Sequence, residues 1–313
     1  MINKKNKDPL SNYKIAALIP CLNEETTIEN TIISFKTACP GIEIYVCDNG
    51  STDRTTAIAK KNGVEVIHEK KRGKGSAVDR LFQTVNADIY VMVDGDNTYD
   101  LNTLKNVLLL MVKEKADMIV GVRKAKNLNA FPVGHQFGNK LFNSVIQLCF
   151  GRGITDVLSG YRVLSNRFIK NYPNLAQGFD VEVEMSVHAL EINCKIIETD
   201  IEYFQRPLNS ESKLRTFSDG FKILLRILLL LIDNKPILIF LNIALIIFLI
   251  SIGILTPVFI FWLDNGIVPR MPTFILGLIL LIISFISLFF GIVLESISRQ
   301  RKEIKKIIFK NSL

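Results

Sequence analysis

The stretch IYVMVDGD, residues 89–96, decides the fold class of this chain. Five consecutive apolar residues are typical of a short buried strand, and Asp94 and Asp96 follow where that strand ends. Two carboxylates one residue apart at a strand end can hold one hard divalent ion, which can also bind a diphosphate. A lone Asp-x-Asp is a weak signal because loops are rich in aspartate, so the surrounding sequence has to support it.

The sequence on both sides of this stretch alternates between apolar runs and helical segments. The apolar runs predict strands at residues 14–19, 43–47, 64–67, 88–93 and 117–122. Helices are predicted from about residue 23, at 53–62 and at 75–86. Strands that alternate with helices imply right-handed crossovers and a mostly parallel sheet, so the fold class is α/β.

Polar motifs follow three of these predicted strands. They are residues 23–25 (NEE), residues 48–53 (DNGSTD) and residues 94–96 (DGD). In open α/β sheets, ligands bind beyond the carboxyl ends of the strands. We therefore expect the three motifs to converge on one crevice.

The composition changes after residue 235. Residues 237–263 and 273–294 contain no charged residue, and each run is long enough to cross a hydrocarbon core as a helix. The tail that follows has six basic residues and one acidic residue, a net charge of +5 out of the formal +8. Positive residues beside a span stay cytoplasmic, so we predict a cell-membrane protein with two spans and with the N-terminal domain and both termini in the cytoplasm. The basic balance then indicates membrane lipid, not nucleic acid.

The rest of the chain divides around these spans. Residues 217–232 predict an amphipathic helix lying in the membrane interface, with a core helix of the soluble domain as the alternative. The expected domains are a cytosolic domain (1–215), the interfacial helix (216–235), two transmembrane helices (236–296) and a basic tail (297–313). Residues 1–14 are polar and predict no secretory signal. The five cysteines lack metal-like spacing and are expected to be reduced thiols.

The ordered set of motifs resembles family-two glycosyltransferases, most closely the subgroup that makes dolichyl- and undecaprenyl-phosphate sugars. The resemblance is carried by 19–25, 47–53, 73–75, 94–96, 155–162, 178–185, Arg206 and 212–214, and it covers roughly residues 14–225. Two C-terminal spans also occur in bacterial members of this subgroup. The resemblance implies a GT-A catalytic domain with a Rossmann-like sheet. It also implies transfer, with inversion, of a sugar from a nucleotide-sugar to a polyprenyl phosphate.

The resemblance assigns roles on the donor side. The residues that would bind the nucleotide-sugar are Pro20, Asn23, Glu25, Asp48, Lys74 and Asp94. Asp94 and Asp96 would hold Mg²⁺ or Mn²⁺, and Asp96 would thereby serve catalysis. Two positions depart from the family pattern: Thr98 stands where a third ligand, often glutamine, is found, and Asn49 stands where a second aspartate is frequent.

The resemblance also assigns the acceptor side. Residues expected to contact the acceptor phosphate or the diphosphate are Arg123, His135, Arg162, Arg206 and Lys213. His135 replaces a family serine, and Phe131 stands near a second family arginine that it cannot replace. Asp156 matches an aspartate close to bond making. Since a phosphomonoester is largely deprotonated at neutral pH, we expect Asp156 to orient the acceptor or balance charge more than to remove a proton.

Several alternatives remain open at this level. A processive polysaccharide synthase usually carries a Gln-x-x-Arg-Trp element, but the only tryptophan here is Trp262, at the end of the first span. A glycosyltransferase acting on a diacylglycerol lipid and a non-enzymatic nucleotide-binding scaffold are the others. UDP-glucose, UDP-N-acetylglucosamine and GDP-mannose are all compatible donors. The oligomeric state, including a homo-oligomer, is also open.

Overall fold

The computed structural model describes residues 9–125, 154–173, 181–205 and 228–312, together with 143, 144, 146, 147, 150, 151, 178, 224 and 225. It forms two compact units, Met1–Ile227 with Lys306–Leu313, and Leu228–Lys305. The predicted site residues His135, Arg206 and Lys213, and most of the predicted interfacial helix, lie outside the described residues.

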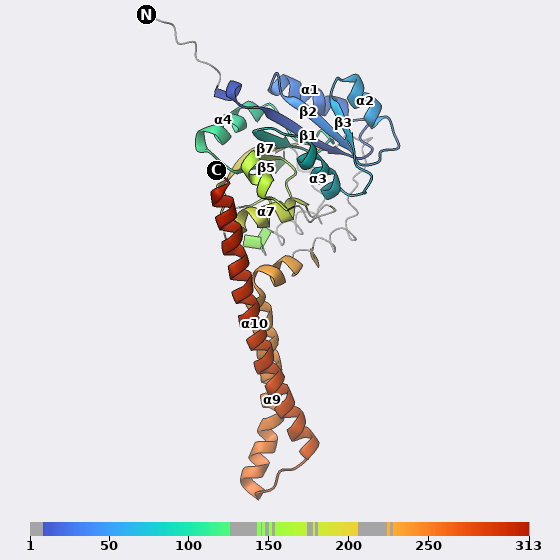
Figure 1. The fold of residues 1–313 in the computed structure, drawn as a ribbon. Helices are drawn as coiled ribbons and strands as arrows, with labels where there is room; N and C mark the ends of the chain where they lie inside the picture. Colours follow the sequence, from blue (N-terminus) through green and yellow to red (C-terminus); the bar gives the residue numbers. More distant parts are fainter. Residues whose placement is uncertain are drawn as a thin grey trace, which may run out of the picture. The chain divides into compact units, whose positions relative to one another are not determined.

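The first unit is built on a seven-stranded sheet (Figure 1). Its strands are β1 Ile15–Cys21, β2 Glu43–Asp48, β3 Glu65–His68, β4 Ile89–Met92, β5 Met118–Ala125, β6 Arg162–Ser165 and β7 Ile196–Tyr203. They lie in the order β3-β2-β1-β4-β6-β5-β7. All neighbours are parallel except β6, which is antiparallel to both β4 and β5. The predicted mostly parallel α/β sheet is confirmed, and β6 and β7 are additions to it.

Helices pack on both faces of this sheet. They are η1 Pro9–Asn12, α1 Ile28–Ala38, α2 Thr55–Lys61, α3 Lys74–Thr84, α4 Leu104–Glu114, α6 Asn166–Asn171 and α7 Val181–Glu191. Side chains of a strand alternate between faces, so Ala17 and Ile19 of β1 share a core with α1 and α4. Ala16 and Leu18 share the other core with α3 and α7. Burial on both faces explains why β1 reads as an unbroken apolar run.

The register brings the strand ends to one edge. Cys21, the last residue of β1, pairs with Asp48, the last residue of β2. On the other side of β1, the Val93 amide after β4 donates to the Leu18 carbonyl oxygen (3.2 Å). Because β6 runs in the opposite direction, it is the segment leading into β6 that reaches this edge. The edge is therefore where the predicted polar motifs gather.

The second unit contains two long helices, α9 Pro236–Asn265 and most of α10 Met271–Asn311, both long and apolar enough to cross a membrane. They pack closely through small residues: the Ser251 hydroxyl donates to the Gly277 carbonyl oxygen (2.8 Å), and the Ser284 hydroxyl donates to that of Ala244 (3.0 Å). A Cβ on Gly277 would lie 2.6 Å from the Leu255 side chain. Small residues and interhelical hydroxyl bonds are typical of helix pairs in lipid. Most large apolar side chains of both helices are exposed, as expected for surfaces that face an apolar solvent.

Candidate active site

The two aspartates after β4 differ in their surroundings. Asp96 is buried, and its Oδ1 accepts hydrogen bonds from the Thr98 amide (3.1 Å) and hydroxyl (2.6 Å). The Asp94 side chain is 27% exposed. Thr98 stands where a third metal ligand is often found in the family. Here its hydroxyl donates to the Asp96 carboxylate and orients it.

Cys21 lies between the Asp94–Asp96 loop and Asp48. It pairs with Asp48 in the sheet, and a Cβ on Gly95 would lie 2.6 Å from its Sγ. Burial raises the pKa of the Cys21 thiol, and nearby carboxylates, including those of Asp94 and Asp48, raise it further. The motifs at the ends of β2 and β4 are therefore neighbours, as the sequence predicts.

The motifs after β1 and β2 are interlocked. The Asp48 Oδ1 accepts from the Ser51 amide (3.0 Å), and its Oδ2 lies 3.3 Å from the His68 Nδ1. Asn23, with a left-handed φ of 52°, receives the Thr52 amide on its Oδ1 (2.8 Å) and donates its own amide to the Ser51 hydroxyl (2.9 Å). These bonds fix the two loops against each other and hold the carboxylate of Asp48 in place.

Two other predicted donor-side residues lie close by. Glu25 accepts from the Arg54 amide (3.0 Å) and side chain (3.3 Å), so its carboxylate holds the turn that starts α2. Pro20 is the penultimate residue of β1 and pairs with Cys47. Both residues lie next to the loops that carry Asn23 and Asp48.

Lys74, the first residue of α3, lies between two carboxylates. Its Nζ is 2.5 Å from Asp94 Oδ1 and also forms an ion pair with Glu182, in the first turn of α7. Burial works against the charged ammonium, but Asp94 and Glu182 outweigh it and raise the pKa of Lys74. Lys74 is therefore a fixed cation beside Asp94. Glu182 falls within the 178–185 motif, but no sequence pattern predicts its role beside Lys74.

Asn49 builds the loop that presents Lys74. Its side-chain amide donates to the carbonyl oxygens of Glu69 (3.2 Å) and Lys71 (2.7 Å), and its Oδ1 accepts from the Gly73 amide (2.7 Å). A carboxylate could accept but could not donate, so an aspartate at this position would lose two of the three bonds. Asn49, where the family often has an aspartate, thus holds the loop that leads to Lys74.

Arg123 and Asp156 form a buried bidentate ion pair. The guanidinium donates from Nε (2.8 Å) and Nη2 (2.7 Å) to the two carboxylate oxygens, and the Arg123 amide adds a third bond (3.1 Å). Burial opposes the charge, but the bonds to Asp156 prevail and raise the pKa of Arg123. Glu198 of β7 anchors the same loop by accepting the Thr155 amide (2.5 Å). Two residues predicted separately are thus one unit.

Arg162 holds the loop that carries Asp156 through hydrogen bonds to its backbone. Its side chain is fully buried and donates to the carbonyl oxygens of Ser159 (3.1 Å) and Val157 (2.7 Å), and burial lowers its pKa. A guanidinium with no exposed surface is not placed to receive a phosphate. In place of the predicted phosphate contact, the structure gives Arg162 the task of shaping the loop that carries Asp156.

Two tyrosines that are not among the predicted site residues complete this edge. The Tyr203 ring, at the end of β7, lies under the Arg123 guanidinium (5.6 Å) and packs against Tyr99 (5.1 Å between centroids). Burial raises the pKa of Tyr203, and the charges of Asp96 and Asp94 add to this effect. By its contacts, Tyr203 lies between Tyr99, in the loop after β4, and Arg123 of the Arg123–Asp156 pair.

The donor set fits a hard divalent ion that substrate helps to hold. Among the described residues, no group of three or more His, Cys, Asp or Glu side chains is arranged to hold a metal. Asp94 and Asp96 provide two carboxylates, and Mg²⁺ in proteins is often bound by one or two carboxylates with water and substrate phosphates completing its shell. Residues 94 and 96 thus suit an ion that arrives with a diphosphate, and not a closed structural site.

Gly160 gives a direct test of this geometry. A Cβ at this position would lie 2.5 Å from Asp94 Oδ2, so Gly160→Ala has to displace that carboxylate. We expect Mn²⁺ affinity and activity to fall about tenfold, equivalent to about 1.4 kcal/mol, measured by titration and by initial rates. Gly253→Ala, where a Cβ meets nothing within 4 Å, is the control and should change neither. Unchanged Mn²⁺ affinity in Gly160→Ala would contradict the placement of Asp94 at the metal.

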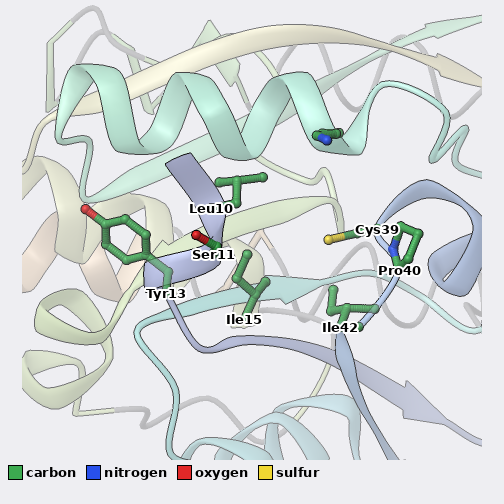
Figure 2. A pocket seen from close by; sticks show the side chains of 9 residues that line it. Leu10, Ser11, Tyr13, Ile15, Cys39, Pro40 and Ile42 are labelled. Atoms are coloured by element: carbon green, nitrogen blue, oxygen red, sulfur yellow. The ribbon is translucent and has the colours of Figure 1, made fainter. Parts of the chain in front are cut away.

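A separate cavity lies at the opposite edge of the sheet. Figure 2 shows it between η1, the start of β1 and the segment before β2, with Tyr13, Ile15, Pro40 and Ile42 in its wall. Its volume is about 330 Å³. Ile15 begins β1, whereas the polar motifs follow the other end of that strand. This cavity is therefore distinct from the candidate active site.

Comparisons with known proteins show which family this chain is similar to. The model of the family described as "Glycosyl transferase family 2" matches residues 16–172. Protein RfbJ of Shigella flexneri is 42% identical over 125 residues, which cover 40% of this chain and 97% of that protein. A dolichyl-phosphate hexose transferase of Haloferax volcanii is 26% identical over 206 residues, covering 66% of this chain and 89% of that protein.

A solved structure supports the fold. Glucosyl-3-phosphoglycerate synthase from Mycobacterium tuberculosis, in complex with Mn²⁺, UDP-glucose and phosphoglyceric acid, superposes with a TM-score of 0.57 at 22% identity. The match covers 71% of this chain and 80% of that one. At this identity the likeness shows the fold alone.

Proposed function

Because this chain belongs to glycosyl transferase family 2, we propose that it transfers a sugar from a nucleotide-sugar to a polyprenyl phosphate at a membrane. One observation carries the proposal: Asp48, Lys74, Asp94 and the Arg123–Asp156 pair all gather at the carboxyl edge of the sheet. That edge offers carboxylates for a metal and cations for phosphates, the two requirements of a nucleotide-sugar transferase.

On the donor side, Asp94 and Asp96 would hold Mg²⁺ or Mn²⁺, and this ion would supply positive charge to neutralise the diphosphate of the donor. Lys74 lies beside Asp94, and its ammonium would stabilise the leaving nucleoside diphosphate. Asp48 and Asn23, locked together through Ser51, would face the base and ribose. UDP-glucose, UDP-N-acetylglucosamine and GDP-mannose remain the candidate donors.

On the acceptor side, Arg123 is the described cation best suited to orient a phosphate. Asp156 already occupies one side of its guanidinium through two hydrogen bonds. A polyprenyl phosphate is largely deprotonated at neutral pH and needs no general base. Asp156 therefore holds Arg123 in place while a phosphate oxygen attacks the anomeric carbon with inversion. His135, Arg206 and Lys213 remain proposed acceptor contacts.

The membrane part of the proposal rests on composition and on a relative. α9 and α10 are long and apolar enough to span, and one relative is named a dolichyl-phosphate hexose transferase. A lipid-linked acceptor keeps its phosphate at the headgroup level, so an anchored enzyme gains access to it. The basic residues after the second span favour a cytoplasmic catalytic domain and cytoplasmic termini.

Transfer to lipid tests this function directly. Membranes containing the full chain are incubated with each radiolabelled donor and undecaprenyl phosphate, and label is measured in the organic extract. We expect one donor to give extractable label and EDTA to lower the rate by at least about 10²-fold, with recovery on adding Mg²⁺ or Mn²⁺. Label that enters only diacylglycerol or a water-soluble polymer, or transfer that EDTA leaves unchanged, would contradict the proposal.

A further inference from the structure

Lys74 is shared by two carboxylates that differ in exposure. The Asp94 side chain is 27% exposed, whereas the Glu182 side chain is 4% exposed, and the Lys74 ammonium forms an ion pair with each. Only Asp94 is therefore accessible to a ligand that enters from solvent. Glu182 can interact with that ligand only through Lys74.

The backbone around Lys74 is fixed from two directions. The Gly73 amide donates to the Asn49 Oδ1 (2.7 Å), and the Gly75 amide donates to the Gly178 carbonyl oxygen (3.0 Å), close to the start of α7. The backbone at Lys74 is thus held between the residue that follows β2 and the segment that precedes α7. What remains adjustable is the partner that its ammonium uses.

An ammonium on Asp94 competes with a divalent ion for the same carboxylate. If Asp94 were its sole partner, binding of the ion would leave a buried ammonium unpaired beside a new positive charge, which is strongly unfavourable. Glu182 removes this conflict because it keeps one negative charge on Lys74 whichever partner Asp94 has. The two carboxylates thus make Asp94 available without expelling Lys74 from the site.

We propose that Glu182 is a positioning residue that retains Lys74 when Asp94 turns to the ion of the nucleotide-sugar donor. This inference rests on the proposed function, because it takes Asp94 as a metal ligand. In the site without donor, Lys74 neutralises Asp94. With donor bound, Lys74 stays on Glu182 and is directed at the diphosphate.

Mn²⁺ binding to the full-length protein in detergent tests the proposal, with free Mn²⁺ followed by electron paramagnetic resonance. In Glu182→Gln, Asp94 is the one carboxylate in the described part of the chain that still pairs with Lys74, so we expect Mn²⁺ affinity to fall about tenfold. In a Lys74→Met background the competitor is absent, so adding Glu182→Gln should change the affinity less than about twofold. An equal loss in both backgrounds would mean that Glu182 acts only through its charge, and would overturn the proposal.

Two further variants separate contact from charge and folding. Glu182→Asp keeps the charge but withdraws the carboxylate, so we expect an intermediate loss of Mn²⁺ affinity, and a wild-type value would count against the proposal. Glu184→Gln removes a buried carboxylate from the same helix and should leave the affinity within about twofold. Thermal unfolding confirms that each variant is folded. If the wild-type protein binds no Mn²⁺ with or without UDP, the metal site of the proposed function fails as well.

Discussion

Replacing Asp94 with Asn is expected to lower kcat/KM for sugar transfer by about 10²- to 10³-fold. The substitution removes one of two carboxylates available to the ion and also the exposed partner of Lys74. An amide keeps the size of the side chain but has no charge to hold either cation. Initial rates with the donor identified by the extraction assay, across a range of Mg²⁺ and Mn²⁺ concentrations, measure the effect.

The same variant should also lose its response to chelation. EDTA-treated wild-type protein and Asp94→Asn should have similar residual rates, because both lack the ion. Asp100→Asn is the matched control: this carboxylate follows the same strand, and among the described residues its hydrogen bond comes from the Asn102 amide (3.0 Å), so activity should stay within about twofold. An Asp94→Asn protein that keeps a tenth of the wild-type rate and still responds to EDTA would rule out Asp94 as a ligand.

The first half of the fold was predictable because its signals are local. β1 to β4 are short apolar runs followed by polar turns, and α1 to α3 lie between them, so the order of elements follows from the printed sequence. The GT-A fold implied by the resemblance is confirmed by the family match and by the superposed structure.

β6 and β7 were missed for two different reasons. β6 has four residues and begins with Arg162, a charged residue that reads as loop although the fold buries it completely. In β7, Glu198, Asp200 and Glu202 alternate with β-branched or aromatic residues, and this period-two pattern is a strand signal that could have been used. Missing β7 also hid Tyr203, which lies at its end beside Arg123.

The sequence predicted several residues that the structure brings to this edge of the sheet, but it did not predict their pairings. Lys74 and Glu182 are 108 positions apart, and Arg123 and Asp156 are 33 apart, so no local pattern joins either pair. Only the crossing of strands and helices brings them together. Arg162 shows the converse: a motif match does not separate a residue that touches ligand from one that supports the loop beneath it.

Breaking the Arg123–Asp156 pair should have the second-largest effect. Arg123→Ala and Asp156→Asn are each expected to lower kcat/KM about 10²-fold, because one removes the phosphate-orienting cation and the other releases it. If the two act as one unit, the double variant should be little worse than either single variant. Arg123→Lys keeps the charge but loses the bidentate geometry, so it should recover only a small part of the rate.

Stability measurements separate orientation from simple loss of folding. The pair is buried, with side chains 14% and 6% exposed, so removing one side chain leaves a buried charge without its bidentate ion-pair partner and should cost about 3 kcal/mol of unfolding free energy. The neighbouring Lys124–Asp200 pair is 58% and 69% exposed, and Asp200→Asn should change stability by less than about 0.5 kcal/mol and leave activity intact. Arg123→Ala and Asp156→Asn effects that multiply in the double variant would show that the two residues act independently. In that case Asp156 would have a role of its own at the reacting atoms, beyond holding Arg123.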